Sequence, residues 1–169
     1  MQRILVPLDG SQLAEAILPH AKELGLRLSA TIYLVRVVPL ARQLAAVGLG
    51  GSGGIDGLPS LDIKAIEEAV AIQMQDARTY LEVQAGKLQD EGLVVEWDVR
   101  QGAAAEEIVQ YAQANNIDLI AISSHGRSGL GRLIFGSVCD RVMRDAGIPV
   151  LMVKSPKKER KSGSADGEE

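Results

Sequence analysis

Aromatic residues are scarce in this chain and make up only 3% of its 169 residues. Its core must therefore be aliphatic, and 169 residues are enough for one such core. The single cysteine, Cys139, excludes an intrachain disulfide and suits a reducing compartment. No apolar run reaches the ~18 residues of a membrane span, and no signal-peptide pattern opens the sequence. A net charge of -4 argues against a nucleic-acid partner. We expect one soluble, cytoplasmic, globular domain that binds neither nucleic acid nor a membrane.

The phosphate-binding fingerprints of common nucleotide enzymes are also missing. The sequence contains no G-x-x-x-x-G-K-[ST], so it has no P-loop lysine. Gly129 and Gly131 begin a G-x-G, but Ile134 stands where a dinucleotide fingerprint has its third glycine. These absences exclude the usual nucleotide hydrolases and dehydrogenases.

Apolar periodicity predicts strands that alternate with helices. The chain shows runs typical of strands at 3–8, 31–38, 94–100, 118–123 and 150–153. Helical spacing of apolar residues covers 11–25, 61–90, 103–115 and 137–146. The continuous apolar run at 31–38 indicates burial on both faces, whereas the alternation at 94–100 indicates an edge strand on which Trp97 covers one face.

Three residues are expected to shape the first helix. Ser11 is a good N-cap, Pro19 removes a backbone hydrogen bond and predicts a kink, and Gly25 marks the end. Ser137 is the expected cap of the last helix.

This alternation predicts an α/β fold of the Rossmann-like type. Right-handed crossovers would give an open, doubly wound, five-stranded parallel sheet with order 3-2-1-4-5 and helices on both faces. Ligands of such sheets bind beyond the carboxyl ends of the strands, where the connection direction reverses. The loops expected there are 9–11, 47–59, 100–102 and 124–136.

The glycine-punctuated segment 123–137 is the most informative part of the chain. Glycines let backbone N–H groups approach an anion, and the following helix N-terminus favours negative charge. Ser137 adds a hydroxyl, and Arg127 and Arg132 add positive charge. The pattern fits either a phosphate site or a loop that only turns the chain.

At this point the sequence resembles the universal stress protein family. The similarity rests on the strand that leads into Asp9-Gly10-Ser11, the Ser-His-Gly-Arg-Ser-Gly loop at 124–129, the helix start at 136–138 and the closing strand from Pro149. It covers residues 1–154, and the polar tail at 155–169 is expected to be disordered.

Nucleotide-binding members carry G-x-x-G, nine residues, then G-[ST]. Gly126, Gly136 and Ser137 match this pattern, but Ser123 stands in place of the first glycine. The resemblance implies phosphate contacts at those three matching residues, with Arg127 and Gly129 in the same loop. It also implies that Asp9 lies near the ribose or phosphates and that Pro7, Val37 and Val99 line the adenine pocket. The alternatives are a simple turn former for Asp9 and ordinary sheet packing for the other three.

Two further side chains suggest chemistry at first sight. We expect His125 to position its loop rather than to catalyse, and Cys139 to be a packed thiol. No catalytic residue is predicted.

The resemblance implies a stress-response protein that binds ATP or AMP, with Mg²⁺ or Mn²⁺ bridging the phosphates of ATP. It also implies a homodimer formed through the last strand, Val150 to Val153. Hydrolysis is expected to be absent or weak, since neither a P-loop lysine nor an evident base is present. The rival interpretations are a nucleotide-free interaction module, an ATP-using enzyme of the wider superfamily and a flavoprotein. The glycine-rich segment 47–59 is either a lid or an inserted loop.

Overall fold

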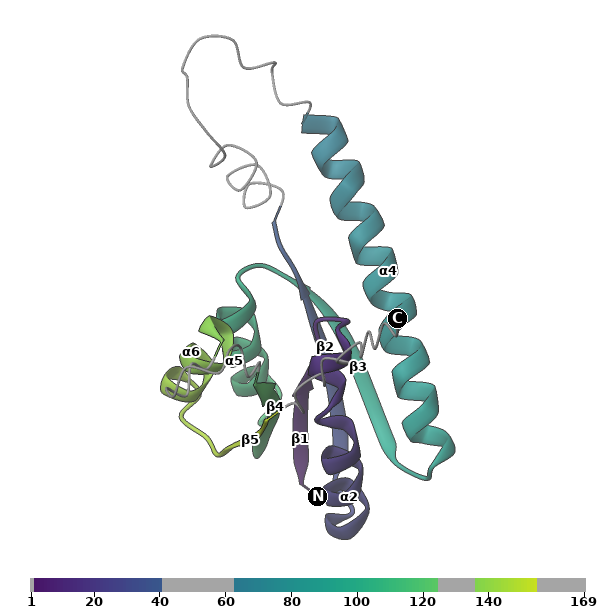
Figure 1. The fold of residues 1–169 in the computed structure, drawn as a ribbon, viewed down its shortest axis with the longest axis vertical. Helices are drawn as coiled ribbons and strands as arrows, with labels where there is room; N and C mark the ends of the chain where they lie inside the picture. The colour runs from purple at the N-terminus through teal and green to yellow at the C-terminus, as the bar shows by residue number, and fades with distance from the viewer. Residues whose placement is uncertain (1, 41–62, 125–135, 155–169) are drawn as a thin grey trace, which may run out of the picture.

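The computed structural model describes residues 2–40, 63–124 and 136–154, and within them it forms one five-stranded parallel sheet (Figure 1). The strands are β1 (Arg3–Pro7), β2 (Thr31–Val38), β3 (Val94–Gln101), β4 (Leu119–Ser124) and β5 (Val150–Lys154). Their order across the sheet is β3-β2-β1-β4-β5, and each neighbouring pair is parallel. The predicted α/β class and strand order are confirmed.

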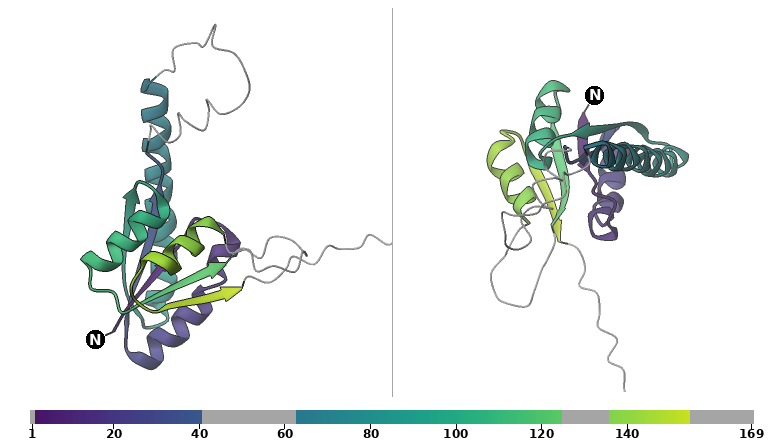
Figure 2. Two further views of the ribbon diagram at one scale, coloured as in Figure 1. Left: turned by 90° about the vertical axis from the view of Figure 1, so that its left-hand side faces the viewer. Right: turned by 90° about the horizontal axis from the view of Figure 1, so that it is seen from above.

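Helices lie on both faces of the sheet (Figure 2). One face carries α1 (Gln12–Glu15), α2 (Leu18–Leu28) and α4 (Ile63–Asp90), and the other carries α5 (Ala104–Ala114) and α6 (Ser137–Asp145). Alternate strand residues point to opposite faces, which divides the core into two clusters. The first contains Ile4, Val6, Ile32, Leu34, Ile17, Ala21, Leu81 and Ala85, and the second contains Leu5, Tyr33, Val35, Ile120, Ile108, Ala112, Cys139 and Val142.

The positions of the strands explain their sequence patterns. β2 is buried along nearly its whole length between two neighbours, as its continuous apolar run predicted. β3 is an edge strand with exposed residues, and the side chain of Trp97 on it is 38% exposed. The alternating pattern at 94–100 therefore identified the edge correctly.

The segment after β1 differs from its prediction. Ser11 caps α1 as expected, since its Oγ accepts a hydrogen bond from the Ala14 N–H at 3.1 Å. The prediction of one kinked helix was wrong, because the chain forms two separate helices. Pro19 lies in the first turn of α2, where helical N–H groups have no acceptor and a missing N–H costs little.

The predicted helix end at Gly25 was also wrong. Helix α2 continues to Leu28 and ends at Ser29, which has a left-handed φ of 50°. Gly25 is buried, and an ideal Cβ there would lie 2.6 Å from Cδ2 of Leu93 and 3.1 Å from Cδ1 of Ile32. Glycine is needed here because the helix backbone packs directly on these two side chains.

The start of α6 needs a smaller correction. The N-cap residue is Gly136, without a side-chain hydrogen bond, and Ser137 is the first helical residue. The predicted loop at 47–59 and the tail at 155–169 lie outside the described residues. In the part of the chain that the structure describes, no helix is long and apolar enough to cross a membrane.

Candidate functional site

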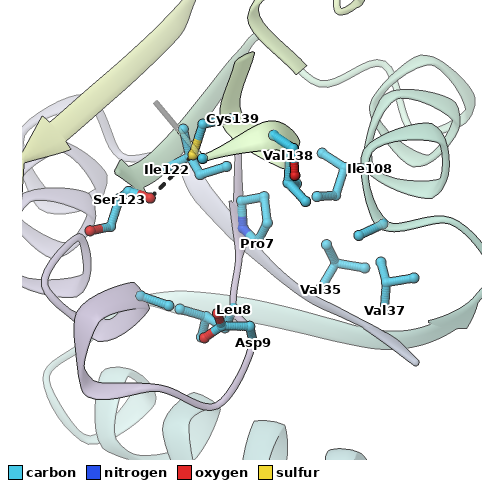
Figure 3. A pocket seen from close by; sticks show the side chains of 14 residues that line it. Pro7, Leu8, Asp9, Val35, Val37, Ile108, Ile122, Ser123, Val138 and Cys139 are labelled. Atoms are coloured by element: carbon cyan, nitrogen blue, oxygen red, sulfur yellow. Dashed lines mark hydrogen bonds between the residues drawn. The ribbon is translucent and has the colours of Figure 1, made fainter. Parts of the chain in front are cut away.

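A pocket of about 260 Å³ opens at the carboxyl ends of β1, β2 and β4 (Figure 3). This is the side on which parallel α/β sheets bind ligands, and β1 is the strand at which the chain changes direction across the sheet. The residues that line it are Pro7, Leu8, Asp9, Ala14, Val35, Val37, Ala104, Ile108, Ile122, Ser123, Gly136, Ser137, Val138 and Cys139.

Most of the pocket wall is aliphatic. Val35 and Val37 come from β2, Ile108 from α5, Ile122 from β4 and Val138 from the start of α6, and Figure 3 shows them around Pro7. A concave apolar wall with a few polar groups at its edge is typical of sites that bind small molecules. The pocket therefore fits a ligand with an apolar or aromatic part better than a fully polar ligand.

The turn after β1 presents a carboxylate at the rim. Asp9 is exposed, and its Oδ1 accepts a hydrogen bond from the Ser11 N–H at 2.8 Å. Gly10 has a φ of 86°, and an ideal Cβ on it would lie 3.0 Å from Nη1 of Arg36. A side chain at this position would be strained and would crowd the guanidinium group. The geometry of the turn thus depends on glycine and orients the carboxylate of Asp9.

The N-terminus of α6 forms the opposite rim. Gly136, Ser137 and Val138 line the pocket there. The first N–H groups of a helix have no acceptor within the helix, and the helix dipole adds partial positive charge. Asp140 in this first turn is paired with Arg144 one turn later, which offsets its negative charge. This rim can therefore receive an anionic group such as a phosphate.

Cys139 in the first turn of α6 also lines the pocket. Its side chain is only 4% exposed, and its Sγ donates a hydrogen bond to the carbonyl oxygen of Ser123 at 3.3 Å. Burial, and to a smaller extent the charge of Asp9, raises the pKa of the thiol above its usual value. A raised pKa keeps the thiol protonated and poorly nucleophilic. The expected packing of this cysteine is confirmed.

The structure brings together five of the predicted site residues. They come from β1 and its turn, from β2 and from the start of α6, and they are Pro7, Asp9, Val37, Gly136 and Ser137. Gly126, Arg127 and Gly129, together with His125, lie outside the described residues.

Val99 is not among the residues that line the pocket. In the parallel ladder of β2 and β3 it pairs with Arg36, whereas Val37 pairs with Arg100. Paired residues of neighbouring strands point to the same side of a sheet, so Val99 faces the opposite side from Val37. It packs against the first core cluster, which α4 covers.

Several pocket residues were missed from the sequence. Val35 lies two residues before Val37 on the same face of β2, and this period of two could have identified it. Ile108 lies one turn into α5, so its contribution follows from the packing of that helix and not from a motif. In the described ranges no group of three or more His, Cys, Asp or Glu side chains is placed to hold a metal ion.

Comparison with known proteins finds relatives that cover most of this chain. The model of the universal stress protein family matches residues 1–154. Universal stress protein MJ0531 of Methanocaldococcus jannaschii is 31% identical over 158 residues, which cover 94% of this chain and 85% of the relative. The solved structure of protein MJ0577, from the same organism, has a TM-score of 0.72 and 27% identity over 92% of this chain and 97% of that chain.

Two more distant solved structures share the fold. A universal stress protein in complex with cAMP has 21% identity and a TM-score of 0.56, over 92% of this chain and 98% of that chain. The universal stress protein of Archaeoglobus fulgidus in complex with dAMP has 20% identity and a TM-score of 0.55, over 91% and 98%. The family match over residues 1–154 and the curated relative that is 31% identical together show that this chain belongs to the universal stress protein family.

Proposed function

We propose that this protein is a stress-response protein that binds an adenine nucleotide, ATP or AMP, in the pocket at the carboxyl ends of β1, β2 and β4. The observation that supports this most directly is the composition of the pocket, in which an aliphatic wall lies between a carboxylate rim and a helix N-terminus. Complexes of two family members with cAMP and with dAMP agree with an adenine nucleotide as the ligand class.

Each part of the pocket has a proposed role. Pro7 and Val37 would contact the adenine ring, and Asp9 would bind the ribose or a metal-bound phosphate. Gly136 and Ser137 would bind phosphate together with Gly126, Arg127 and Gly129 of the preceding segment. No adenine contact is proposed for Val99, because this residue faces the other side of the sheet and packs against the first core cluster.

Little or no hydrolysis is expected. Asp9 and Cys139 are the titratable residues that line the pocket in the described part of the chain, and the thiol of Cys139 is held protonated. Asp9 is an exposed carboxylate at the rim and is better suited to a divalent cation than to the activation of water. Mg²⁺ or Mn²⁺ would therefore be held mainly by the phosphates of ATP, with Asp9 as the protein ligand.

The test is acid extraction of the freshly purified protein with mass spectrometry of the released nucleotides, beside calorimetric titration with Mg-ATP and with AMP. A Gly136→Val variant should abolish binding. No atom of the described residues lies within 4 Å of an ideal Cβ at Gly136, so among them the added side chain meets open space at the phosphate rim and not the core. Gly86→Val in α4, also in open space, is the matched control and should bind normally. If neither extraction nor titration detects a nucleotide, the proposal is wrong and a nucleotide-free interaction module becomes the better interpretation.

We further propose a homodimer formed through β5. This strand pairs with β4 alone among the described strands, and its residues from Val150 to Val153 are half-buried. An apolar edge strand is a template for pairing with another chain. Met152→Lys should give monomers in sedimentation equilibrium, whereas Val94→Lys at the opposite sheet edge should leave the dimer intact. A monomeric parent protein would contradict this assembly.

A further inference from the structure

Ser123 connects three of the segments that border the pocket. It is 5% exposed, and its Oγ donates a hydrogen bond to the carbonyl oxygen of Leu13 at 2.7 Å. Its own carbonyl oxygen accepts the hydrogen bond from Cys139. Ser123 therefore links β4, in which it lies, to α1 on one side and to α6 on the other.

The hydroxyl of Ser123 points toward α1. Figure 3 shows this side chain directed away from Pro7 and Val138, toward the segment that follows β1. Although Ser123 lines the pocket, the hydroxyl that distinguishes it from a motif glycine is engaged in a buried contact with the backbone of α1.

Helix α1 depends on such external contacts. It has four residues, and a single helical turn is not stable by itself. On one side Ser123 holds Leu13. On the other side Glu15 Oε1 accepts hydrogen bonds from the Tyr80 hydroxyl at 2.9 Å and from Gln84 Nε2 at 3.3 Å, both in α4. The short helix is thus fixed between β4 and α4.

The same contacts extend to Asp9. Ser11 accepts the Ala14 N–H as the cap of α1, and its own N–H donates to the Asp9 carboxylate. A displacement of α1 would therefore rotate the turn that presents this carboxylate at the rim. The hydrogen bond from Ser123 acts on Asp9 through α1 and the cap.

We propose that Ser123 is a positioning residue of the nucleotide site, whose hydroxyl holds α1 and thereby the Asp9 turn in the binding geometry. This inference rests on the proposed function, since it concerns the same pocket. It also gives a reason for the departure from the glycine motif. Glycine has no side chain, whereas the hydroxyl of Ser123 holds α1 and with it the Asp9 turn.

The test compares three variants by calorimetric titration with AMP. Ser123→Ala and Ser123→Gly remove the hydroxyl and should weaken binding by about 3- to 10-fold, the equivalent of one lost hydrogen bond. Ser123→Thr keeps the hydroxyl and should stay within about 2-fold of the parent. If glycine were the better residue because it lets a phosphate approach, Ser123→Gly would bind more tightly, and that result would overturn the proposal.

A control separates positioning from general stability. Thr31→Val removes another buried hydroxyl, from a residue 4% exposed at the amino end of β2, remote from the pocket. It should lower the melting temperature without changing AMP affinity, and an equal loss of affinity in this variant would contradict a specific role for Ser123. In the double variant with Asp9→Ala, Ser123→Ala should add no further loss, because it acts through Asp9.

Hydrogen exchange provides a readout that needs no ligand. In Ser123→Ala the amides of residues 11–15 should exchange faster, whereas those of β2 and β3 should stay protected. Unchanged exchange at 11–15 would refute the contact with α1. If the parent protein bound no adenine nucleotide at all, the proposed function would be wrong, and the exchange experiment would still decide whether Ser123 holds this turn.

Discussion

Gly25 and Gly86 both lie inside helices, yet replacement by alanine should change stability in opposite directions. Alanine is favoured over glycine in a helix interior by about 0.8–1 kcal/mol. At Gly86 in α4 no atom of residues 2–40, 63–124 or 136–154 lies within 4 Å of an ideal Cβ, so none of them opposes this gain. We expect Gly86→Ala to raise the free energy of unfolding by about 0.8–1 kcal/mol, and the melting temperature by about 2–4 °C.

At Gly25 the added methyl group meets a filled core. Its Cβ would lie 2.6 Å from Cδ2 of Leu93 and 3.1 Å from Cδ1 of Ile32, and both side chains are buried. Overpacking of this kind costs about 1–3 kcal/mol. After the gain in helix propensity is subtracted, Gly25→Ala should lower the free energy of unfolding by up to about 2 kcal/mol. Because the propensity gain is common to both variants, the difference between them measures the steric cost.

Urea unfolding followed by circular dichroism gives both free energies. A double variant, Gly25→Ala with Leu93→Ala, tests the cause, because removal of the Leu93 side chain should cancel the cost of the alanine at position 25. A Gly25→Ala protein more stable than the parent would refute the close approach of α2 to Leu93. A loss of stability in Gly86→Ala would refute the open surroundings of that residue.

Three other predictions concern titration, a helix contact and the thiol. Burial raises the pKa of Tyr111 to about 12 from the ordinary 10.0, so the contribution of Tyr111 to the free energy of unfolding should be constant below about pH 10 and fall by about 1.4 kcal/mol per pH unit between 10 and 12. Tyr111→Phe should make this alkaline decline less steep, and an equal slope in both proteins would contradict the shift. Tyr80→Phe removes the donor to Glu15 and should cost about 1–2 kcal/mol in urea unfolding, with little further loss when Glu15→Gln is added. Cys139 should react with iodoacetamide far more slowly in the native protein than in urea, and equal rates would show that the thiol is not buried.

The strongly periodic segments could be predicted from the sequence because their patterns need little context. The apolar positions of the long helix at 61–90 and the continuous run of β2 have one geometric solution each, and the structure forms both. Pro19 and Gly25 were interpreted wrongly because each residue has two common uses. Proline suits a kink or a first helical turn, and glycine suits a helix end or a close contact. Only the position of Leu93 beside α2 decides the second case.

The same limit applies to the site. Pro7, Asp9 and Gly136 could be grouped in advance because the carboxyl ends of parallel strands share one edge of the sheet. The side of the sheet that Val99 faces depends on the register between β2 and β3, which no motif specifies. The partner of the Ser123 hydroxyl depends on where the short helix α1 packs, and the composition of a glycine-rich segment does not contain that information.

The central place of β1 has a consequence for biosynthesis. β1 precedes the other strands in chain order, and its first edge is covered as soon as β2 is made. Its second edge stays unpaired until β4 is made. The Arg3 N–H likewise donates a hydrogen bond to the carboxylate of Asp118, a residue 115 positions later in the chain. While a ribosome translates this interval, the nascent chain carries an open backbone edge on which another chain can assemble. A holding chaperone that covers this edge would prevent such assembly until β4 is made and pairs with β1.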